Sequence, residues 1–395
     1  MHRSGGLAVA AAWRAATQAL PARPRGYSHG QVTTIAPSTG PAGNPSTQLG
    51  RLGLACPRSL CSNAETPAQD LVQFIRGLAA SGRSGDVGDG PAQLEAAEAD
   101  VRAAFGHGTP RERVSLLGDL ATLATIPGRP YGIAKHFLVF LENYAAELDT
   151  LRDGETIAER ADELQGVLKC FHVAGIHTAR LSMIYGHIER DFPRIEASGA
   201  LLPMPAALRL CHLMLSTGLS SPQAVIVLLR ATLREPLMHF SDDSVELRLL
   251  KMVEMLLRVD FLTTQEQLPR EVVEYLSVVR NLRYYDQALR RDTPLSYQLA
   301  FFLRKHGFPC KRHMVGPYAL KVCDPKERVN FEPVEVRDCR FGMPELPTAR
   351  KKRHLEAVGW RYIEVSDAKW RELETYEAKA AHVRQLMKAH DMLDP

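Results

Sequence analysis

The stretch ALRLCHLMLSTGLSSPQAVIVLLRATLRE, residues 207 to 235, decides the fold of the central part of the chain. Its apolar residues recur at intervals of three and four on both sides of a short break, which predicts two helices that each bury one face. Gly218 lies where the first helix would end, and Pro222 opens the second, where its missing N–H costs no hydrogen bond. The stretch therefore predicts a pair of helices joined by a tight turn.

The same pattern recurs on both sides of this stretch. The first helices of successive pairs end 50, 43 and 42 residues apart, at Ile126, Ile176, Leu219 and Phe261. We expect a mostly α chain whose body, residues 110 to 293, is a solenoid-like α-helical repeat, with a non-repeating helical bundle as the alternative. The expected helices are 115 to 126, 163 to 176, 207 to 219 and 247 to 261, alternating with 135 to 148, 179 to 192, 222 to 235 and 269 to 285.

The overall composition excludes several classes of protein. Of 395 residues, 45% are hydrophobic and 24% are charged, which is typical of globular proteins. No run of 18 apolar residues occurs, so no membrane span is expected. The seven cysteines are scattered, which argues against a disulfide-stapled secreted scaffold. The sequence has neither a zinc-ligand spacing nor a phosphate-cradling glycine loop, and we expect no metal and no cofactor.

Positive charge without any acid marks the N-terminal region. Residues 1 to 64 contain six Arg and neither Asp nor Glu. Arg-rich, acid-free composition is typical of organelle transit peptides, and we assign one to residues 1 to 28. It predicts the mitochondrial matrix, with a plastid as the alternative, while a disordered tail without a targeting role is the other interpretation. Residues 29 to 109 are expected to be a low-complexity linker with short helices at 70 to 80 and 92 to 105.

The pattern changes after residue 293, where apolar alternation typical of strands appears. An amphipathic helix is expected over 296 to 307, a helix with four consecutive basic residues over 348 to 359, and a final helix over about 370 to 390. The expected strands are YALKVC (318 to 323), RVNFEPVEV (328 to 336) and WRYIEV (360 to 365). This order predicts a compact α/β module over residues 294 to 391.

One run in this module has a distinctive order of residues. Arg353-His354-Leu355-Glu356-Ala357-Val358-Gly359-Trp360 is followed by Ile363-Glu364-Val365, Trp370, Leu373, Lys379 and the closing HVRQLM. This run resembles the RAP domain, in which a basic start leads into His-Leu-Glu, an aliphatic residue, Gly and an aromatic residue. The resemblance spans about residues 296 to 391, a quarter of the chain.

The resemblance implies a restriction-endonuclease-like fold for the module. It also implies a preceding body of helical repeats similar to those of FAST kinase, heptatricopeptide or octotricopeptide repeat proteins. Proteins with this layout act in the processing, stability and translation of RNA in mitochondria and chloroplasts. Some relatives are built into divergent mitochondrial ribosomes.

A nuclease of this fold needs carboxylates on adjacent strands to hold a divalent metal. Relatives that retain these acids have an Asp on the first strand, where this sequence aligns Lys321. Glu332 matches the acid of the second strand, but the carboxylate expected two residues later is missing. A shifted alignment would use Asp324 with Glu335 and Arg337. A Lys at the metal position would itself neutralise the site, so we expect no catalytic residue.

The sequence and the resemblance together predict a non-catalytic, RNA-binding protein. It would act on mitochondrial rRNA or mRNA, as a component of the mitochondrial ribosome or as a factor for it, with mitochondrial ribosomal proteins as further partners. Two alternatives stay open. The first is a metal-dependent RNA endonuclease, and the second is a protein-only structural subunit of an organellar complex.

Basic residues are the candidate binding feature of the module. Residues 296 to 361 contain 14 basic and 7 acidic residues, whereas residues 65 to 295 have a net charge of −7. Binding to phosphate is largely electrostatic, so basic clusters can supply affinity for RNA without any chemistry. The alternative for such a run is a solvated helix face. The candidate RNA-binding residues are Arg304, Lys305, Lys311, Arg312, Lys321, Arg350, Lys351, Lys352 and Arg353, with Tyr318, Phe341 and His313 as candidates for stacking on bases.

Overall fold

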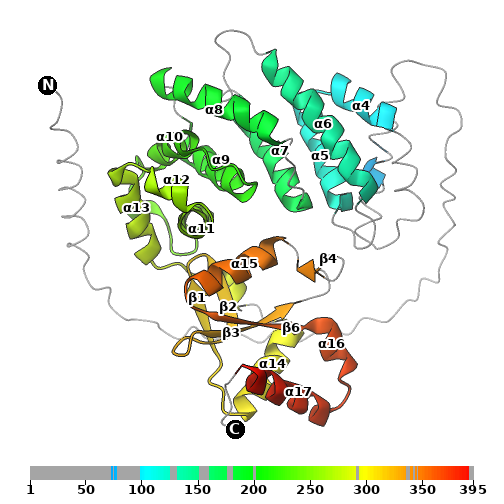
Figure 1. Ribbon diagram of the computed structural model, residues 1–395, viewed down its shortest axis with the longest axis vertical. Coiled ribbons are helices and arrows are strands. Elements are labelled where there is room, and N and C mark those ends of the chain that lie inside the picture. Colours follow the sequence, from blue (N-terminus) through cyan, green and yellow to red (C-terminus); the bar gives the residue numbers. More distant parts are fainter. Residues whose placement is uncertain are drawn as a thin grey trace, which may run out of the picture. The chain divides into compact units, whose positions relative to one another are not determined.

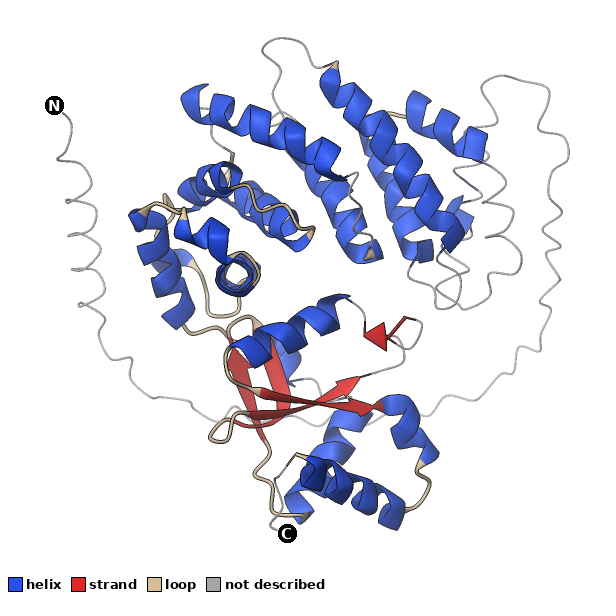
Figure 2. Ribbon diagram, in the orientation of Figure 1, coloured by secondary structure: helices blue, strands red, loops and turns tan. Residues whose placement is uncertain are grey.

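The structure is a computed structural model. It describes residues 98–124, 131–150, 160–175, 181–198, 202–290, 293–334 and 346–390, together with 73, 75–77, 339–340 and 343–344. Over these residues the protein is mostly helical, with a small mixed sheet of four strands near the C-terminus (Figure 2). The mostly α fold is therefore confirmed. The transit peptide expected over residues 1 to 28 and most of the expected linker lie outside the described residues.

The helices of the body follow the expected pairs closely (Figure 1). They are α4 (Glu98–His107), α5 (Pro110–Ala124), α6 (Tyr131–Asp149), α7 (Ala161–Ala174), α8 (Leu181–Ser198), α9 (Met204–Ser216), α10 (Pro222–Thr232), α11 (Val245–Val259), α12 (Leu262–Glu266) and α13 (Arg270–Asn281). Two short 3-10 helices, η1 (Leu237–His239) and η2 (Gln287–Arg290), complete this part.

Local chemistry sets the ends of these helices. Gly175 follows α7 in the left-handed region, with φ 64°, and its N–H donates to carbonyls of the last turn. Gly218 follows α9 with φ 96°; positive φ costs glycine little because it has no Cβ. Pro222 opens α10, and Ser244 caps α11 by accepting a hydrogen bond from the Leu247 N–H at 3.1 Å.

The body helices contact one another in two rows. In the first row α5 contacts α7, α7 contacts α9, and α9 contacts α11; in the second row α6 contacts α8, α8 contacts α10, and α10 contacts α13. Helix α4 packs on α6, where the rings of Phe105 and Phe140 meet edge to face at 4.9 Å. The second of the two short helices expected in the linker therefore docks on the body.

The C-terminal module contains four helices and a sheet in the order β1-β2-β3-β6. β2 pairs antiparallel with both β1 and β3, whereas β6 runs parallel to β3. The elements are α14 (Pro294–Lys305), β1 (Lys311–Val315), β2 (Tyr318–Asp324), β3 (Val329–Val334), α15 (Leu346–Ala357), β6 (Arg361–Ser366), α16 (Asp367–Glu372) and α17 (Tyr376–Ala389), with a separate pair of two-residue strands, β4 (Cys339–Arg340) and β5 (Met343–Pro344).

Three features of the module differ from the sequence prediction, the first being the short strand pair β4–β5, which was not expected. Strand β1 was not expected, because its polar start Lys311-Arg312-His313 is exposed and hides the alternation of an edge strand. The single final helix expected over 370 to 390 is wrong, since α16 and α17 are separate. Thr375 caps α17 by accepting a hydrogen bond from the Ala378 N–H at 3.1 Å, which starts a new helix.

Each face of the sheet packs against a different set of helices. Val322, Val329, Phe331, Ile363 and Val365 form one core with α14, α16 and α17. The opposite face carries a second core, which takes Leu355 from α15 and Met255 from α11; its strand residues are Tyr318, Leu320, Cys323 and Tyr362, with Trp360 just before β6. The body therefore contributes directly to covering the second face. Both Trp360 and Trp370 are buried.

We predict that the α5–α7 crossing tolerates no side chain at Gly166. A Cβ at this position would overlap Cγ1 of Val114, whose branched side chain has little freedom to move. Gly166→Ala should lower the free energy of unfolding by about 1–3 kcal/mol through overpacking, measured by urea denaturation. Adding Val114→Ala should recover part of this loss.

Gly186 in α8 provides the matched control, because a Cβ there would meet nothing within 4 Å. Gly186→Ala should raise stability by about 0.5–1 kcal/mol, since alanine favours the helix. Equal effects of the two substitutions would contradict the packing described for α5 and α7.

Candidate nucleic-acid interface

Two of the four consecutive basic residues of α15 neutralise acids on the sheet. Lys351 Nζ lies 2.6 Å from Glu332 Oε1, and Lys352 Nζ lies 3.0 Å from Glu364 Oε1. Glu332 and Glu364 are opposite each other in the register of the parallel strands β3 and β6. Like charges at such positions repel, and the two lysines offset this repulsion. Half of the basic run therefore stabilises the sheet.

Arg353, the last residue of the basic run, joins the module to the body. Its Nε and Nη2 donate to Oδ1 and Oδ2 of Asp260 at 2.9 and 2.8 Å, a bidentate pair. Asp260 is the C-cap of α11. The fully buried His354 also lies on this carboxylate, with Nε2 at 3.0 Å, and its Nδ1 lies 2.7 Å from the hydroxyl of Tyr318. We call Asp260, Arg353 and His354 the Asp260 clamp.

The clamp favours the ionised form of Asp260. Burial acts to raise the pKa of this carboxyl group, but hydrogen bonds from His354 and Arg353 outweigh it and hold the pKa below its ordinary value. The carboxylate therefore stays charged at neutral pH and binds α15 to the end of α11.

Arg350, the first residue of the basic run, is buried, and no described carboxylate balances its charge. It is 7% exposed, and its Nη2 donates to the carbonyl of Ser216 at 2.7 Å. That carbonyl ends α9, where a cation is favoured by the helix dipole. Arg350 Nε is buried without a hydrogen-bond partner, and no described carboxylate lies within ion-pair distance of the guanidinium. Burial lowers the pKa of Arg350, yet a guanidinium stays protonated.

Arg350 and Lys351 line a cleft between the body and the module, which we call the body–module cleft. Its volume is about 620 Å³, within the range of pockets that hold small molecules. α7, α9, α11 and η2 with its flanks supply the body side of its lining, and β2, β3 and α15 supply the module side. The polar lining residues are His172, His212, Arg248, Asp286, Thr293, Tyr318, Lys321, Glu332, Thr348, Arg350 and Lys351.

Lys321 reaches this cleft at a β-bulge. The β1–β2 register pairs His313 with Leu320 but Lys311 with Cys323, so two residues of β2, Lys321 and Val322, lie opposite one residue of β1. An extra residue of this kind reverses the alternation of the strand. Leu320 accordingly belongs to the core that contacts α15, while Val322 belongs to the core on the other face.

The charges of the cleft do not cancel. Arg248 lies 3.7 Å from Asp286, and Lys351 pairs with Glu332. His212 adds no charge, because burial, with smaller effects of His172 and Arg350, lowers its pKa to about 3. Lys321 and Arg350 then remain without a carboxylate partner among the described residues. The two acids of the cleft are thus already paired, and the surplus charge is positive.

The other predicted residues lie outside the cleft. Arg304 and Lys305 end α14, and Lys311 and Arg312 lie on the edge strand β1; all four are exposed. The Lys305 ammonium lies 5.0 Å from the ring centroid of Phe301. None of these four residues lines the cleft, so the nine predicted residues are not brought together at one site.

The expected stacking residues have other roles. Tyr318 is buried and bonded to His354, and His313 stacks on Trp360 with centroids 5.8 Å apart. Phe341 lies outside the residues whose side chains are described. Tyr318 therefore offers no free ring face, whereas His313 is exposed and has Trp360 stacked against its ring.

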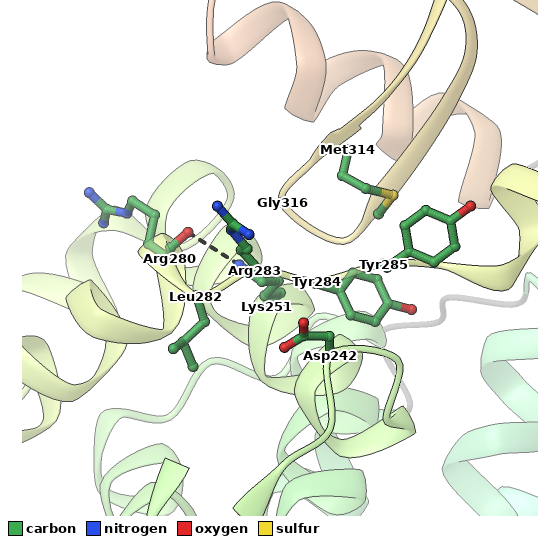
Figure 3. Close-up of a pocket in the computed structure, with 9 residues that line it drawn as sticks. All are labelled: Asp242, Lys251, Arg280, Leu282, Arg283, Tyr284, Tyr285, Met314 and Gly316. Carbon is green, nitrogen blue, oxygen red and sulfur yellow. Dashed lines mark hydrogen bonds between the residues drawn. The ribbon is translucent and has the colours of Figure 1, made fainter. Parts of the chain in front are cut away.

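A second hollow, which we call the tyrosine pocket, shares the turn between β1 and β2 with the body–module cleft (Figure 3). Gly316 lines the pocket, and the next residue, Pro317, lines the cleft. Its volume is about 410 Å³. The buried Lys251 donates to the carbonyls of Val279 and Arg280 at the end of α13, at 2.9 and 3.2 Å. Figure 3 shows the guanidinium of Arg280 directed away from the other lining side chains, while Tyr284 and Tyr285 lie near Met314. Tyr285 is exposed, and the guanidinium of Arg290 lies 5.2 Å from its ring centroid.

The acids considered for nuclease chemistry have structural partners. Asp324 is buried, and its Oδ1 accepts a hydrogen bond from the Lys326 N–H at 2.9 Å, which holds the β2–β3 turn. Glu332 is bound by Lys351. Glu335 and Arg337 lie outside the described residues. Within the described ranges, no group of three or more His, Cys, Asp or Glu residues could hold a metal ion.

Sequence reasoning missed the body's contribution to these hollows. Arg248 and Tyr285 carry no local signal, because a basic residue on an amphipathic helix is ordinarily solvated. Lys321 and Met314, which line the same two hollows, are distant along the chain and lie there because the module packs on the body through the α11–α15 and β2–η2 contacts.

Comparisons with known proteins add no family. No protein-family model matches the sequence, and no curated protein matches it. Of the helices the structure describes, none is long and apolar enough to cross a membrane.

We predict that Asp260→Asn weakens the docking of α15. The change removes the negative charge that accepts hydrogen bonds from Arg353 and His354. One hydrogen bond to a charged group contributes about 1.5–3 kcal/mol. The free energy of unfolding should fall by an amount in this range, and backbone amides of α15 should exchange faster with deuterium. Asp162→Asn, at an exposed first-turn position of α7, should change stability by less than about 1 kcal/mol. Equal losses in both variants would refute the clamp.

The contribution of Asp260 to the stability of the folded protein should also depend on pH. Its pKa is lowered in the folded protein, so its stabilising effect is fully present above the unfolded value of about 3.9 and is lost as pH falls below it. The stability difference between the wild type and Asp260→Asn should therefore be constant from about pH 7 to pH 5 and shrink below about pH 4. A difference that grows on acidification would show the opposite sign and contradict the assignment.

Proposed function

We propose that this protein is a non-catalytic RNA-binding protein of the mitochondrial matrix. In this proposal, residues 110 to 293 form an α-helical repeat body and residues 294 to 391 form a RAP-like module. The protein acts on mitochondrial rRNA or mRNA, as a component of the mitochondrial ribosome or as a factor for it. The observation that carries the proposal is the surplus positive charge of the body–module cleft at Lys321 and Arg350.

The surroundings of the cleft support RNA as the ligand. The tyrosine pocket adjoins the same β1–β2 turn, and its lining includes the exposed Tyr285 and the exposed Arg283. The guanidinium of Arg290 lies 5.2 Å from the ring centroid of Tyr285. Unpaired bases stack on aromatic rings and on guanidinium planes. The exposed basic residues of α14 and β1 add positive charge on the outside of the module. A single strand could therefore place bases in one hollow and phosphates in the other.

The two rows of body helices support the repeat interpretation. Each helix contacts the next member of its row rather than a common centre, which is the contact pattern of stacked helix pairs. In this arrangement α9 and α11, toward the C-terminal end of the first row, carry the contacts to the module. The body then positions one wall of the cleft.

The partners of the acids favour binding over cleavage. A catalytic metal requires several unoccupied carboxylate or carbonyl oxygens, whereas Glu332 and Glu364 are bound by lysines. Lys321 at the expected metal position also adds positive charge, which opposes a divalent cation. We infer that the module grips the sugar-phosphate backbone without hydrolysing it.

The salt dependence of RNA binding tests this proposal. Displacement of counterions from about four phosphates of a single strand should weaken affinity by about 10- to 100-fold between 50 and 200 mM salt. The measurement is fluorescence anisotropy with a single-stranded RNA of about 20 nucleotides and the full chain. No binding at low salt would sink the proposal and favour a protein-only structural role.

An incubation of the same RNA with Mg²⁺ or Mn²⁺ distinguishes the nuclease alternative. We expect intact RNA with the wild type and with Glu332→Ala. Cleavage that Glu332→Ala abolishes would contradict the non-catalytic role.

A further inference from the structure

We propose that the body–module cleft seats the terminal phosphate monoester of a ribonucleotide, with Arg350 and Lys321 as its ligands. This inference rests on the proposed function and deepens it, because it names the part of the RNA that enters the cleft. The terminal phosphate can come from the 5′ end of an RNA strand or from a free nucleotide.

The burial of Arg350 without a partner anion is the first observation that points to an anionic ligand. More than nine-tenths of this residue is buried, it lines the cleft, and its Nε has no hydrogen-bond partner. A buried cation without a matching anion is costly. The Ser216 carbonyl at 2.7 Å supplies only the partial charge of a helix end. Asp260, the acid that acts on Arg350 from outside the cleft, is held by Arg353 and His354.

The net charge of the cleft is the second observation. Arg248 with Asp286 and Lys351 with Glu332 form two cation–acid pairs. Lys321 and Arg350 are left, a surplus of two positive charges on lining groups. A phosphate monoester carries about −1.5 to −2 at pH 7, whereas an internal phosphodiester carries only one negative charge. The surplus therefore matches a terminal phosphate better than an internal one.

The size of the cleft agrees with one nucleotide. Its volume of about 620 Å³ lies within the range of pockets for small ligands. A duplex, whose grooves and backbones are wider than such a pocket, would remain outside. The hydroxyl-bearing Thr293 and Thr348 also line the cleft, and both can donate hydrogen bonds to ligand oxygens.

The test compares two single-stranded oligoribonucleotides of one sequence that differ only in a 5′ monophosphate or a 5′ hydroxyl. Fluorescence anisotropy with the full chain should show about 10-fold tighter binding of the phosphorylated strand, since charge-assisted hydrogen bonds to both ligands are gained. Uridine 5′-monophosphate should compete with the phosphorylated strand, whereas uridine should not.

Two variants assign the effect to the cleft. Lys321→Gln and Arg350→Gln should each reduce the preference for the phosphorylated strand to less than about 2-fold, because each removes a charged ligand. The Lys321 side chain forms no hydrogen bond or ion pair with a described residue, so its variant remains informative if Arg350→Gln disturbs the docking of α15. Lys326→Gln is the matched control, since Lys326 lies exposed at the β2–β3 turn, outside the cleft lining.

The outcomes separate this inference from the proposed function. Equal affinity for the two strands, or a preference that survives Lys321→Gln, overturns the phosphate seat while RNA binding stands. Binding of uridine 5′-monophosphate without binding of either strand supports the seat for a free nucleotide and overturns the RNA-binding role. Binding of none of these ligands overturns both.

Discussion

The ion pair between Asp260 and Arg353 is the interaction on which the arrangement of the C-terminal part depends. It fixes α15 to the end of α11, and the buried His354 extends it to Tyr318 on the sheet. Arg350, one turn earlier on α15, binds the last carbonyl of α9. Because α15 and Met255 of α11 cover the second face of the sheet together, the module completes its core only against the body. The hollows between them follow from this docking.

The same helix accounts for the charge of the body–module cleft. Lys351 and Lys352 pair with two glutamates that face each other on parallel strands. Because Arg248 pairs with Asp286, the charges of Lys321 and Arg350 are left without a described carboxylate in the cleft. A basic run that supports the fold thus also leaves positive charge where a phosphate could bind. This dual use explains why we assign the α15 residues to different roles.

Much of the fold could be predicted from the sequence, and much of the candidate site could not. Apolar spacing with Gly218 and Pro222 located the helix pairs because these signals are local. Strand β1 was not predicted, because an exposed edge strand needs little apolar alternation. The β-bulge at Lys321 and the partners of Arg350 to Arg353 depend on groups that are distant along the chain, such as Ser216 and Asp260. The basic residues themselves were visible in the sequence, but their partners were not.

The most direct test of the central claim is to map where RNA touches the protein. Single-stranded RNA containing 4-thiouridine would be crosslinked by light to the full chain, and the modified peptides identified by mass spectrometry. Crosslinks concentrated in segments 283 to 288 and 317 to 333, which contribute walls of the two hollows, would agree with this account. Crosslinks confined to the helices of the second row, with none in these segments, would contradict it.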